Sequence, residues 1–294
     1  RPGNRSRALE QHVAGDGETL VHTWVKLDAN NIVTAIVPHS EMGQGAGTAL
    51  TQMLADELDA DWDLVRFEEA PAISQFANHP LGKGMFLAGV DIPDFVVPTV
   101  DGLLLHSAQA LDLQITGGSL SIRATGVYGM RLAGAAVKEM LLTAAAEAWN
   151  VPVGQIVARD SHLIHEATGR KEPYAAFAES ASEMTPPGSP KLKSPDEFKI
   201  IGRHVERHDI PGKVDGTATF ALDIRVPNML YATVKRTPTF GGGITNIDDS
   251  KARAIAGVVD VIALLGEFIL HHKDPSDNLV IGTDANCSEK SSSR

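Results

Sequence analysis

The sequence predicts an α+β protein with two domains. Short segments of alternating apolar residues, which are typical of strands, occur between longer segments with apolar residues at helical spacing. A proline-rich stretch without an apolar pattern, 186–195, separates a long first part from a shorter second part. Because the chain has 294 residues, it is long enough for more than one hydrophobic core.

The composition excludes several classes of function. The 26 basic residues face 37 acidic ones, which gives a net charge of -11 with both signs spread along the chain. Nucleic acid and anionic membrane surfaces are therefore not expected as partners, because both need a basic face. No apolar run reaches the roughly 18 to 20 residues of a transmembrane helix, so no membrane span is expected. The single cysteine, Cys287, cannot form an internal disulfide or hold an iron–sulfur cluster by itself.

The first part of the chain predicts the order strand, glycine-rich loop, helix. A turn at Asn30-Asn31 joins two β-branched segments and indicates a hairpin. The expected elements are strands at 21–27 and 32–37, a loop at 38–48, a helix containing Leu50 to Leu58, and a strand at 64–67.

A second small-residue loop and a second helix follow, at 116–123 and about 127–149. The segment 71–114, which precedes this second loop, contains proline and glycine throughout and is expected to be a long excursion over the surface or over a cofactor. Short strands around Ile156 and Leu163 and a helix at 174–182 complete the first part.

The second part predicts a small α+β module with strands at 217–224, 229–235 and 258–265 and a helix at 250–255. We expect residues 1–19 to form a disordered leader and residues 271–294 a disordered tail, because neither stretch has apolar periodicity. The chain begins with Arg1 rather than Met, and we expect an upstream segment to have been removed, either by processing or by trimming.

The first glycine-rich loop has the features of an anion site. Gly43, Gly45 and Gly47 allow tight turns that bring backbone N–H groups close to a ligand, and the following helix directs its positive end to the same place. A Walker A loop would end in Gly-Lys-Ser/Thr, and a GxGxxG motif would need glycine at Thr48. A nucleotide-binding enzyme using this loop is therefore the weakest of the functions considered.

Two further sets of side chains are candidates for ligand contacts. Gln44 carries a donor and an acceptor that suit a heterocycle edge or an oxo group, although an exposed loop glutamine would look the same. The second loop offers hydroxyl groups and two glycines at a helix start, although an ordinary helix cap would also explain them. Its members are Thr116, Gly117, Gly118, Ser119 and Ser121.

Taken together, these blocks resemble a known family. The first block reads EMGQG from Glu41, followed by TALTQMLADELDADWDLVRFEEAPA, TGGSLS and AGAAVKEMLLTAAAEAW; the second reads DIPGKVDG from Asp209 and PNMLYA from Pro227. They are similar to the molybdopterin-binding large subunit of the xanthine dehydrogenase/aldehyde oxidase family, of the isoquinoline 1-oxidoreductase beta-subunit type. The resemblance covers roughly residues 20 to 266.

The resemblance implies an architecture. It implies a molybdopterin-binding-type α/β domain at 20–185, a linker at 186–195, and a small α/β hammerhead-like domain at 196–270. The first loop, Gly43, Gln44 and Gly45, and the second, Thr116, Gly117, Gly118, Ser119 and Ser121, then match loops that contact the pterin and its phosphates.

The resemblance also implies a chemistry and its partners. The enzymes of this family oxidise N-heteroaromatics or aldehydes with water as the oxygen source. They use molybdenum-molybdopterin cytosine dinucleotide and pass electrons to 2Fe-2S clusters in a separate iron-sulfur small subunit. The lone cysteine agrees with clusters that lie outside this chain. Relatives of this type are often exported after folding, so the periplasm is favoured over the cytoplasm.

The sequence departs from the family pattern in its second half. The Gly-x-Gly-Glu motif that supplies the family's base is absent, and Phe240-Gly241-Gly242-Gly243 is interpreted as a turn within the hammerhead match. Glu41 is expected to orient the loop backbone, and Glu57, Asp59, Asp61 and Asp63 to form a solvated face, so no catalytic base is assigned. We expect a partial large subunit that needs a polypeptide supplying the C-terminal half; the alternative is a truncated, non-catalytic remnant.

Overall fold

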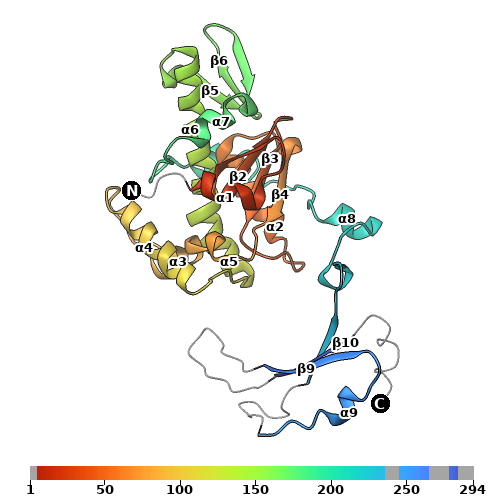
Figure 1. The fold of residues 1–294 in the computed structure, drawn as a ribbon. Helices are drawn as coiled ribbons and strands as arrows, with labels where there is room; N and C mark the ends of the chain where they lie inside the picture. The colour runs from red at the N-terminus through yellow and green to blue at the C-terminus, as the bar shows by residue number, and fades with distance from the viewer. Residues whose placement is uncertain (1–4, 236–244, 265–277, 284–294) are drawn as a thin grey trace. The chain divides into compact units, whose positions relative to one another are not determined.

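The computed structural model describes residues 5–235, 245–264 and 278–283 (Figure 1). The chain forms two compact units, Arg1–Ala218 and Thr219–Arg294. Both helices and sheets are present, as the α+β prediction requires. Among the described residues, no helix has the length and apolar character needed to cross a membrane.

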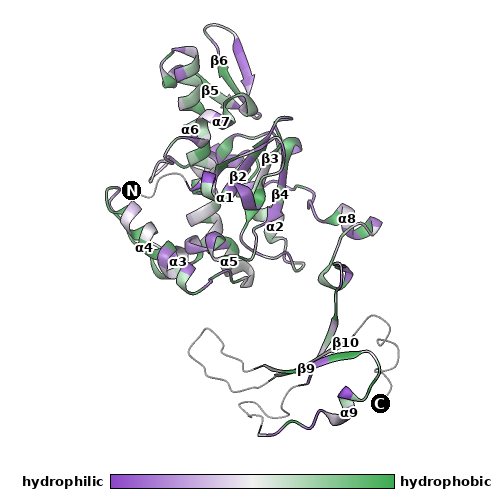
Figure 2. Ribbon diagram, in the orientation of Figure 1, coloured by the Kyte–Doolittle hydropathy of each residue, from purple (hydrophilic) through white to green (hydrophobic). Residues whose placement is uncertain are grey.

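A four-stranded sheet with the order β1-β2-β3-β4 lies at the centre of the first unit. Its strands are β1 (Glu18–His22), β2 (Val25–Asp28), β3 (Val33–Val37) and β4 (Val65–Glu69). Neighbouring strands are antiparallel except for the parallel pair β3 and β4, which the helix α2 (Ala46–Leu58) connects. All five residues of β3 are buried, as expected for a central strand covered on both faces, and Figure 2 shows its hydrophobic colour.

The predicted hairpin is confirmed, but it contains one strand more than expected. Asn31 has φ 66 in the turn between β2 and β3. The segment predicted as one strand at 21–27 is instead two antiparallel strands, with Thr23 and Trp24 in the turn between them. Trp24 and Val25 are both buried, which a single strand with one face in the core would not allow.

The long helix α6 (Arg131–Trp149) packs closely against α2. At Gly134, an added Cβ would lie 2.3 Å from the carbonyl oxygen of Leu54, so only glycine fits at this crossing. The helix α5 (Gly118–Thr125) leads into α6 through a π-helical turn at Gly126–Met130. The second predicted loop, 116–123, is therefore helical from Gly118 onward.

The segment 71–114 is not an irregular excursion. It contains the helices α3 (His79–Phe86) and α4 (Val97–Ala110). Pro80 and Pro98 stand in the first turns of these helices, where the missing N–H group costs nothing. The Asn78 side chain also accepts the Leu81 N–H and caps α3. The prolines thus mark helix starts, and the prediction of a loop was wrong.

The expected leader also contains a helix, α1 (Ser6–Val13). Leu9 is only 2% exposed and belongs to the hydrophobic core. One buried leucine does not produce an apolar periodicity in the sequence, which explains why residues 1–19 were predicted to be disordered.

The rest of the first unit includes a second sheet. Its strands are β5 (Ile156–Arg159), β6 (His162–His165) and the unpredicted β7 (Arg170–Pro173), and they precede helix α7 (Ala178–Ser182). The predicted linker at 186–195 lies within this unit, which extends to Ala218 and includes α8 (Ile210–Asp215). Lys193 explains this difference, because its ammonium group reaches carboxylates of α2.

The second unit contains a three-stranded antiparallel sheet with the order β8-β10-β9. Its elements are β8 (Tyr231–Lys235), α9 (Ser250–Arg253), β9 (Val258–Leu264) and β10 (Asn278–Thr283). The strand predicted at 217–224 is absent; a short helical turn at Ala221–Asp223 takes its place, with Leu222 89% exposed. β10 lies in the predicted tail 271–294 and pairs with β8 and β9. The expected turn at 240–243 lies outside the described residues.

Candidate functional site

The first predicted loop connects β3 to α2, at the carboxyl end of β3. β3 and β4 form a parallel pair joined by this helix, and ligands of α/β sheets bind beyond the carboxyl ends of such strands. Gly43 and Gly45 have φ 99 and 78, in the left-handed region that favours glycine. The predicted order of strand, glycine loop and helix is thus confirmed.

The carboxylate of Glu41 accepts hydrogen bonds from three backbone N–H groups of this loop. Its Oε1 accepts from Gly43 N at 2.9 Å and Gly45 N at 3.0 Å, and its Oε2 accepts from Gly47 N at 3.1 Å. A carboxylate here also interacts favourably with the positive end of α2. The prediction that Glu41 orients the loop backbone is confirmed.

Gln44 makes its side-chain hydrogen bonds inside the same loop. Its Nε2 donates to the Ser40 carbonyl at 2.7 Å, and its Oε1 accepts from Met42 N at 2.6 Å. One donor proton and the second lone pair of the amide remain for a ligand.

The second predicted loop lies beside the first. The Ser40 N–H donates to Thr116 Oγ1 at 3.0 Å, which joins the two loops directly. Gly117 precedes α5, and Gly118, Ser119 and Ser121 form its first turn. An added Cβ at Gly43 or Gly118 would meet no atom within 4 Å, so both glycines border open space.

Sequence reasoning missed a third segment at this site. Arg207 donates to the Gly43 carbonyl through Nη1 at 3.0 Å and to Glu41 Oε1 through Nη2 at 3.2 Å. The neighbouring His208 N donates to Thr48 Oγ1 at 3.1 Å. The available signal was the position of Arg207 two residues before the motif that begins at Asp209, a motif assigned from the sequence to a separate domain.

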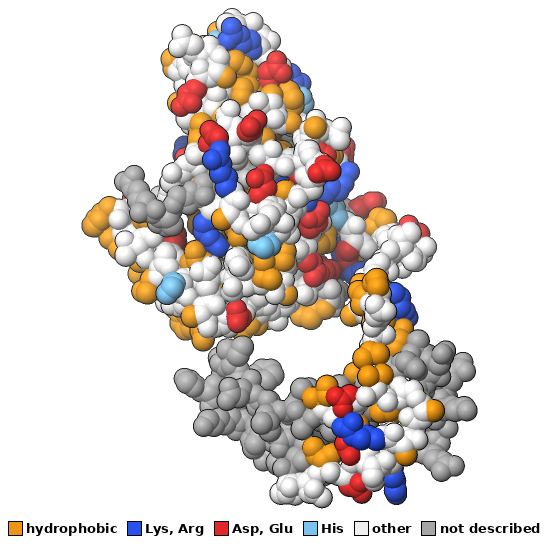
Figure 3. Space-filling view, viewed as in Figure 1, with side chains coloured by type: hydrophobic (Ala, Val, Ile, Leu, Met, Phe, Trp, Pro, Cys, Tyr) orange, Lys and Arg blue, Asp and Glu red, His pale blue; other side chains and the backbone are white. Residues whose placement is uncertain are grey.

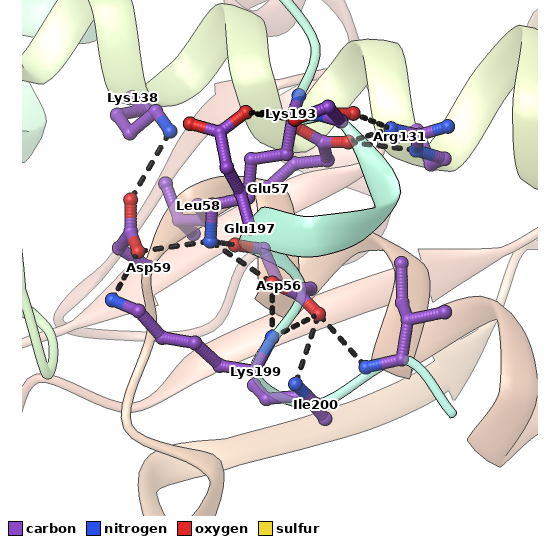
Figure 4. Close-up of polar contacts among 12 residues, drawn as sticks. Asp56, Glu57, Leu58, Asp59, Arg131, Lys138, Lys193, Glu197, Lys199 and Ile200 are labelled. Atoms are coloured by element: carbon purple, nitrogen blue, oxygen red, sulfur yellow. Dashed lines mark hydrogen bonds and ion pairs between the residues drawn. The ribbon is translucent and has the colours of Figure 1, made fainter. Parts of the chain in front are cut away.

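The carboxylates near the end of α2 are not a solvated face (Figure 4). Glu57 is fully buried; Arg131 Nε lies 2.7 Å from its Oε1, and Lys193 N lies 2.9 Å from its Oε2. Asp56 pairs with Lys193 at 2.9 Å, and Asp59 pairs with Lys138, Lys193 and Lys199. The prediction of solvation was wrong for Glu57 and Asp59.

Asp56 and Asp59 are stabilised in their charged form. Burial by itself raises the pKa of Asp56, but the backbone N–H groups of Ile201 and Ile200 and the Lys193 ammonium outweigh burial and lower it. Asp59 follows the same pattern, with its lysine partners lowering the pKa against burial. A general base needs a pKa near the working pH, so neither group is suited to that role.

A cavity of about 530 Å³ lies elsewhere in the first unit and shares no lining residue with the two loops. His22 and His79 line it beside Trp24 and Tyr128. Burial lowers the pKa of His22 to about 4 and that of His79 to about 3, so both are neutral at pH 7. The described residues contain no group of three or more His, Cys, Asp or Glu side chains that could hold a metal ion.

Comparison with known proteins identifies relatives over most of the chain. No family model matches it. It is 29% identical over 277 residues to isoquinoline 1-oxidoreductase subunit beta of Brevundimonas diminuta, covering 83% of this chain and 32% of that protein. It is 27% identical over 263 residues to a membrane-bound aldehyde dehydrogenase of Gluconacetobacter polyoxogenes, whose name specifies pyrroloquinoline quinone, covering 87% of this chain and 29% of that protein.

The name of a third relative specifies molybdopterin. Over 66 residues the chain is 42% identical to the nicotinate dehydrogenase large molybdopterin subunit of Eubacterium barkeri, covering 22% of this chain and 16% of that protein. The chain spans about a third or less of the length of these three relatives. The shared sequence makes it a homologue of the molybdopterin-binding subunits of the xanthine dehydrogenase family, of the isoquinoline 1-oxidoreductase beta-subunit type.

Proposed function

We propose that this chain is the N-terminal part of the large subunit of a molybdenum hydroxylase. The enzyme would oxidise N-heteroaromatics or aldehydes with water as the oxygen source. The observation that supports this most directly is the hydrogen bond from Ser40 N to Thr116 Oγ1. It joins the two loops that resemble the family's pterin-contacting loops, although they are more than 70 residues apart in sequence.

The residues of the two loops fit contact with a pterin. Gly43 and Gly118 border open space, so a flat ligand can approach the backbone closely at both points. The remaining hydrogen-bonding capacity of Gln44 and the hydroxyl of Thr116 are available to orient the ligand. The cofactor, proposed to be molybdenum-molybdopterin cytosine dinucleotide, would supply the metal centre for hydroxylation and accept the electrons of the substrate.

The loop carboxylates do not supply a base. Glu41 is engaged with backbone amides and Arg207, and Glu69 Oε1 accepts the Glu41 N–H at 2.8 Å. The described part of the chain therefore forms one wall of a site. We propose that a polypeptide corresponding to the C-terminal half of the subunit supplies the base and the opposite wall.

The surface of the first unit supports such a partner. Met85, Phe86, Val90, Phe95 and Leu103 belong to one region of the sequence around α3 and α4, and each is more than half exposed. Clustered exposure of large apolar side chains marks interaction surfaces. Elsewhere, acidic and basic side chains are interspersed over the face shown in Figure 3. We propose that the 2Fe-2S clusters lie in a separate iron-sulfur small subunit, since the single cysteine of this chain cannot hold such a cluster by itself.

Metal and cofactor analysis of the assembly tests this proposal. The chain should be purified with its native partners and assayed for molybdenum by mass spectrometry and for pterin after oxidative release. We expect both in proportion to this chain, and iron in proportion to a smaller polypeptide. An assembly that contains pyrroloquinoline quinone, or neither molybdenum nor pterin, would contradict the proposal.

A matched pair of glycine substitutions tests the position of the cofactor. Gly43 and Gly89 both have positive φ, and at both an added Cβ meets open space, but Gly89 belongs to the segment between α3 and α4 and to neither loop. Gly43→Leu should lower the molybdenum content of the assembly at least tenfold, whereas Gly89→Leu should leave it unchanged. An equal effect of both substitutions would indicate backbone strain rather than contact with the cofactor.

The alternative function is that of a non-catalytic fragment that folds and binds a partner. It predicts no turnover in any reconstituted complex. Dye-linked oxidation of isoquinoline, nicotinate or an aldehyde by the assembly would exclude it.

A further inference from the structure

The amide groups of the glycine loop already have an anionic ligand within the chain. The Glu41 carboxylate spans Gly43, Gly45 and Gly47, and its side chain is only 6% exposed. Three backbone N–H groups and the start of a 13-residue helix form the kind of cradle that binds phosphate in other proteins. Here a carboxylate four residues before the helix N-cap occupies that cradle.

Arg207 holds this carboxylate from the other side. Its guanidinium contacts Glu41 and the Gly43 carbonyl, and it forms a two-point ion pair with Asp209 at 2.9 and 2.6 Å. Lys213, one helical turn further on, also pairs with Asp209. Planar guanidinium groups suit such multiple contacts, because several N–H donors are fixed in one plane.

We propose that Glu41 is an internal ligand of the glycine loop, that Arg207 is a positioning residue for it, and that the loop therefore does not bind a phosphate at these three amides. The part of this inference that concerns the loop depends only on the contacts above. The part that concerns the cofactor rests on the proposed function: its phosphates would be held at other groups, while the loop faces the pterin through Gly43 and Gln44.

Removal of the Glu41 side chain provides the first test, through chemical rescue. Glu41→Ala leaves a space for a small carboxylate between the three amides and Arg207. We expect the variant to have a lower thermal unfolding midpoint than the wild-type chain, and acetate to restore at least half of the loss. Acetate should have no comparable effect on the wild-type chain, and chloride at the same ionic strength should not replace acetate.

Hydrogen exchange at the loop amides is the second test, and it does not depend on rescue. Arg207→Ala should increase exchange at Gly43, Gly45 and Gly47 at least tenfold, and Arg207→Lys should have an intermediate effect because one ammonium cannot make all the contacts. Arg203→Ala is the matched control from the same segment and should leave these amides unchanged. Acetate should not rescue Arg207→Ala, because Glu41 still occupies the cradle.

Three results would overturn the inference. Failure of acetate to restore Glu41→Ala would exclude an internal ligand, and unchanged exchange in Arg207→Ala would exclude positioning by Arg207. Inorganic phosphate that slows exchange at the three amides of the wild-type chain would show that the cradle is open to phosphate. None of these measurements requires molybdenum, so the inference about the loop and the proposed function can fail separately.

Discussion

His39 lies in a buried polar cluster just after β3. Its Nε2 is 2.8 Å from Thr125 Oγ1 and 3.2 Å from Asn78 Nδ2. Burial lowers the pKa of His39 to about 4, compared with about 6.5 in an unfolded chain. Between these two values the unfolded chain binds a proton that the folded chain does not, so the free energy of unfolding falls as the pH falls.

Substitution of His39 should remove this contribution to the pH dependence of the free energy of unfolding. Between pH 7 and pH 5, the His39 shift should remove about 2 kcal/mol from the free energy of unfolding of the wild-type chain. His39→Gln should lose that part of the dependence in urea titrations at the two pH values, while His106→Gln, at an exposed position of α4, should retain it. A His39→Gln chain with the full wild-type dependence would show that another group is responsible.

At the scale of single residues, sequence reasoning succeeded where the partners are local. Glu41 contacts amides within six residues, and the glycine pattern beside it is visible in the sequence. Glu57 and Asp59 were misjudged because their charges are compensated by Arg131, Lys138 and Lys193, which are distant in sequence. A buried carboxylate and a solvated one look alike until the fold brings a cation to one of them.

At the scale of elements, the crossing of α2 and α6 depends on close approach at Gly134. Gly134→Ala would place a methyl group 2.3 Å from the Leu54 carbonyl oxygen and force the two helices apart. We expect a loss of about 1 to 3 kcal/mol in the free energy of unfolding, in spite of the higher helix propensity of alanine.

Gly102 in α4 is the control for this substitution. An added Cβ there meets no atom within 4 Å, so only helix propensity acts. Gly102→Ala should therefore raise the free energy of unfolding by about 0.5 to 1 kcal/mol in the same urea titration. Destabilisation by both substitutions would contradict the assignment of close packing to Gly134.

Elements with a strong period were predictable, and elements defined by their neighbours were not. α2 and α6 follow from apolar spacing, and β3 from its β-branched residues. α3 and α4 were missed because Pro80 and Pro98 were interpreted as breaks. β10 was missed because its stability comes from pairing with two other strands, which leaves little signal in its own residues.

At the scale of the whole molecule, the segment after the proline-rich stretch belongs to the first unit. The backbone N–H groups of Lys199, Ile200 and Ile201 donate to the Asp56 carboxylate at 2.8 to 3.3 Å. Arg207 reaches the glycine loop from the same segment. Composition marks 186–195 as a linker, but Lys193 within it and Lys199 after it pair with carboxylates at the end of α2.

Two shortened chains distinguish the compositional boundary from the structural one. A chain of residues 1–218 keeps the buried core and both partners of every ion pair of α2, so it should unfold cooperatively with the stability of the first unit. A chain of residues 1–192 lacks Lys193 and the three amides, so the Asp56 carboxylate loses these partners together with the segment that packs on it. Removing one partner of an ion pair costs about 3 to 5 kcal/mol where the other charge stays buried. Here the Asp56 carboxylate gains access to water, so the loss should be smaller than that and should appear as a lower urea midpoint. Equal midpoints for the two chains would instead place the boundary at 186–195, since the segment from 193 to 218 would then contribute nothing to the unit.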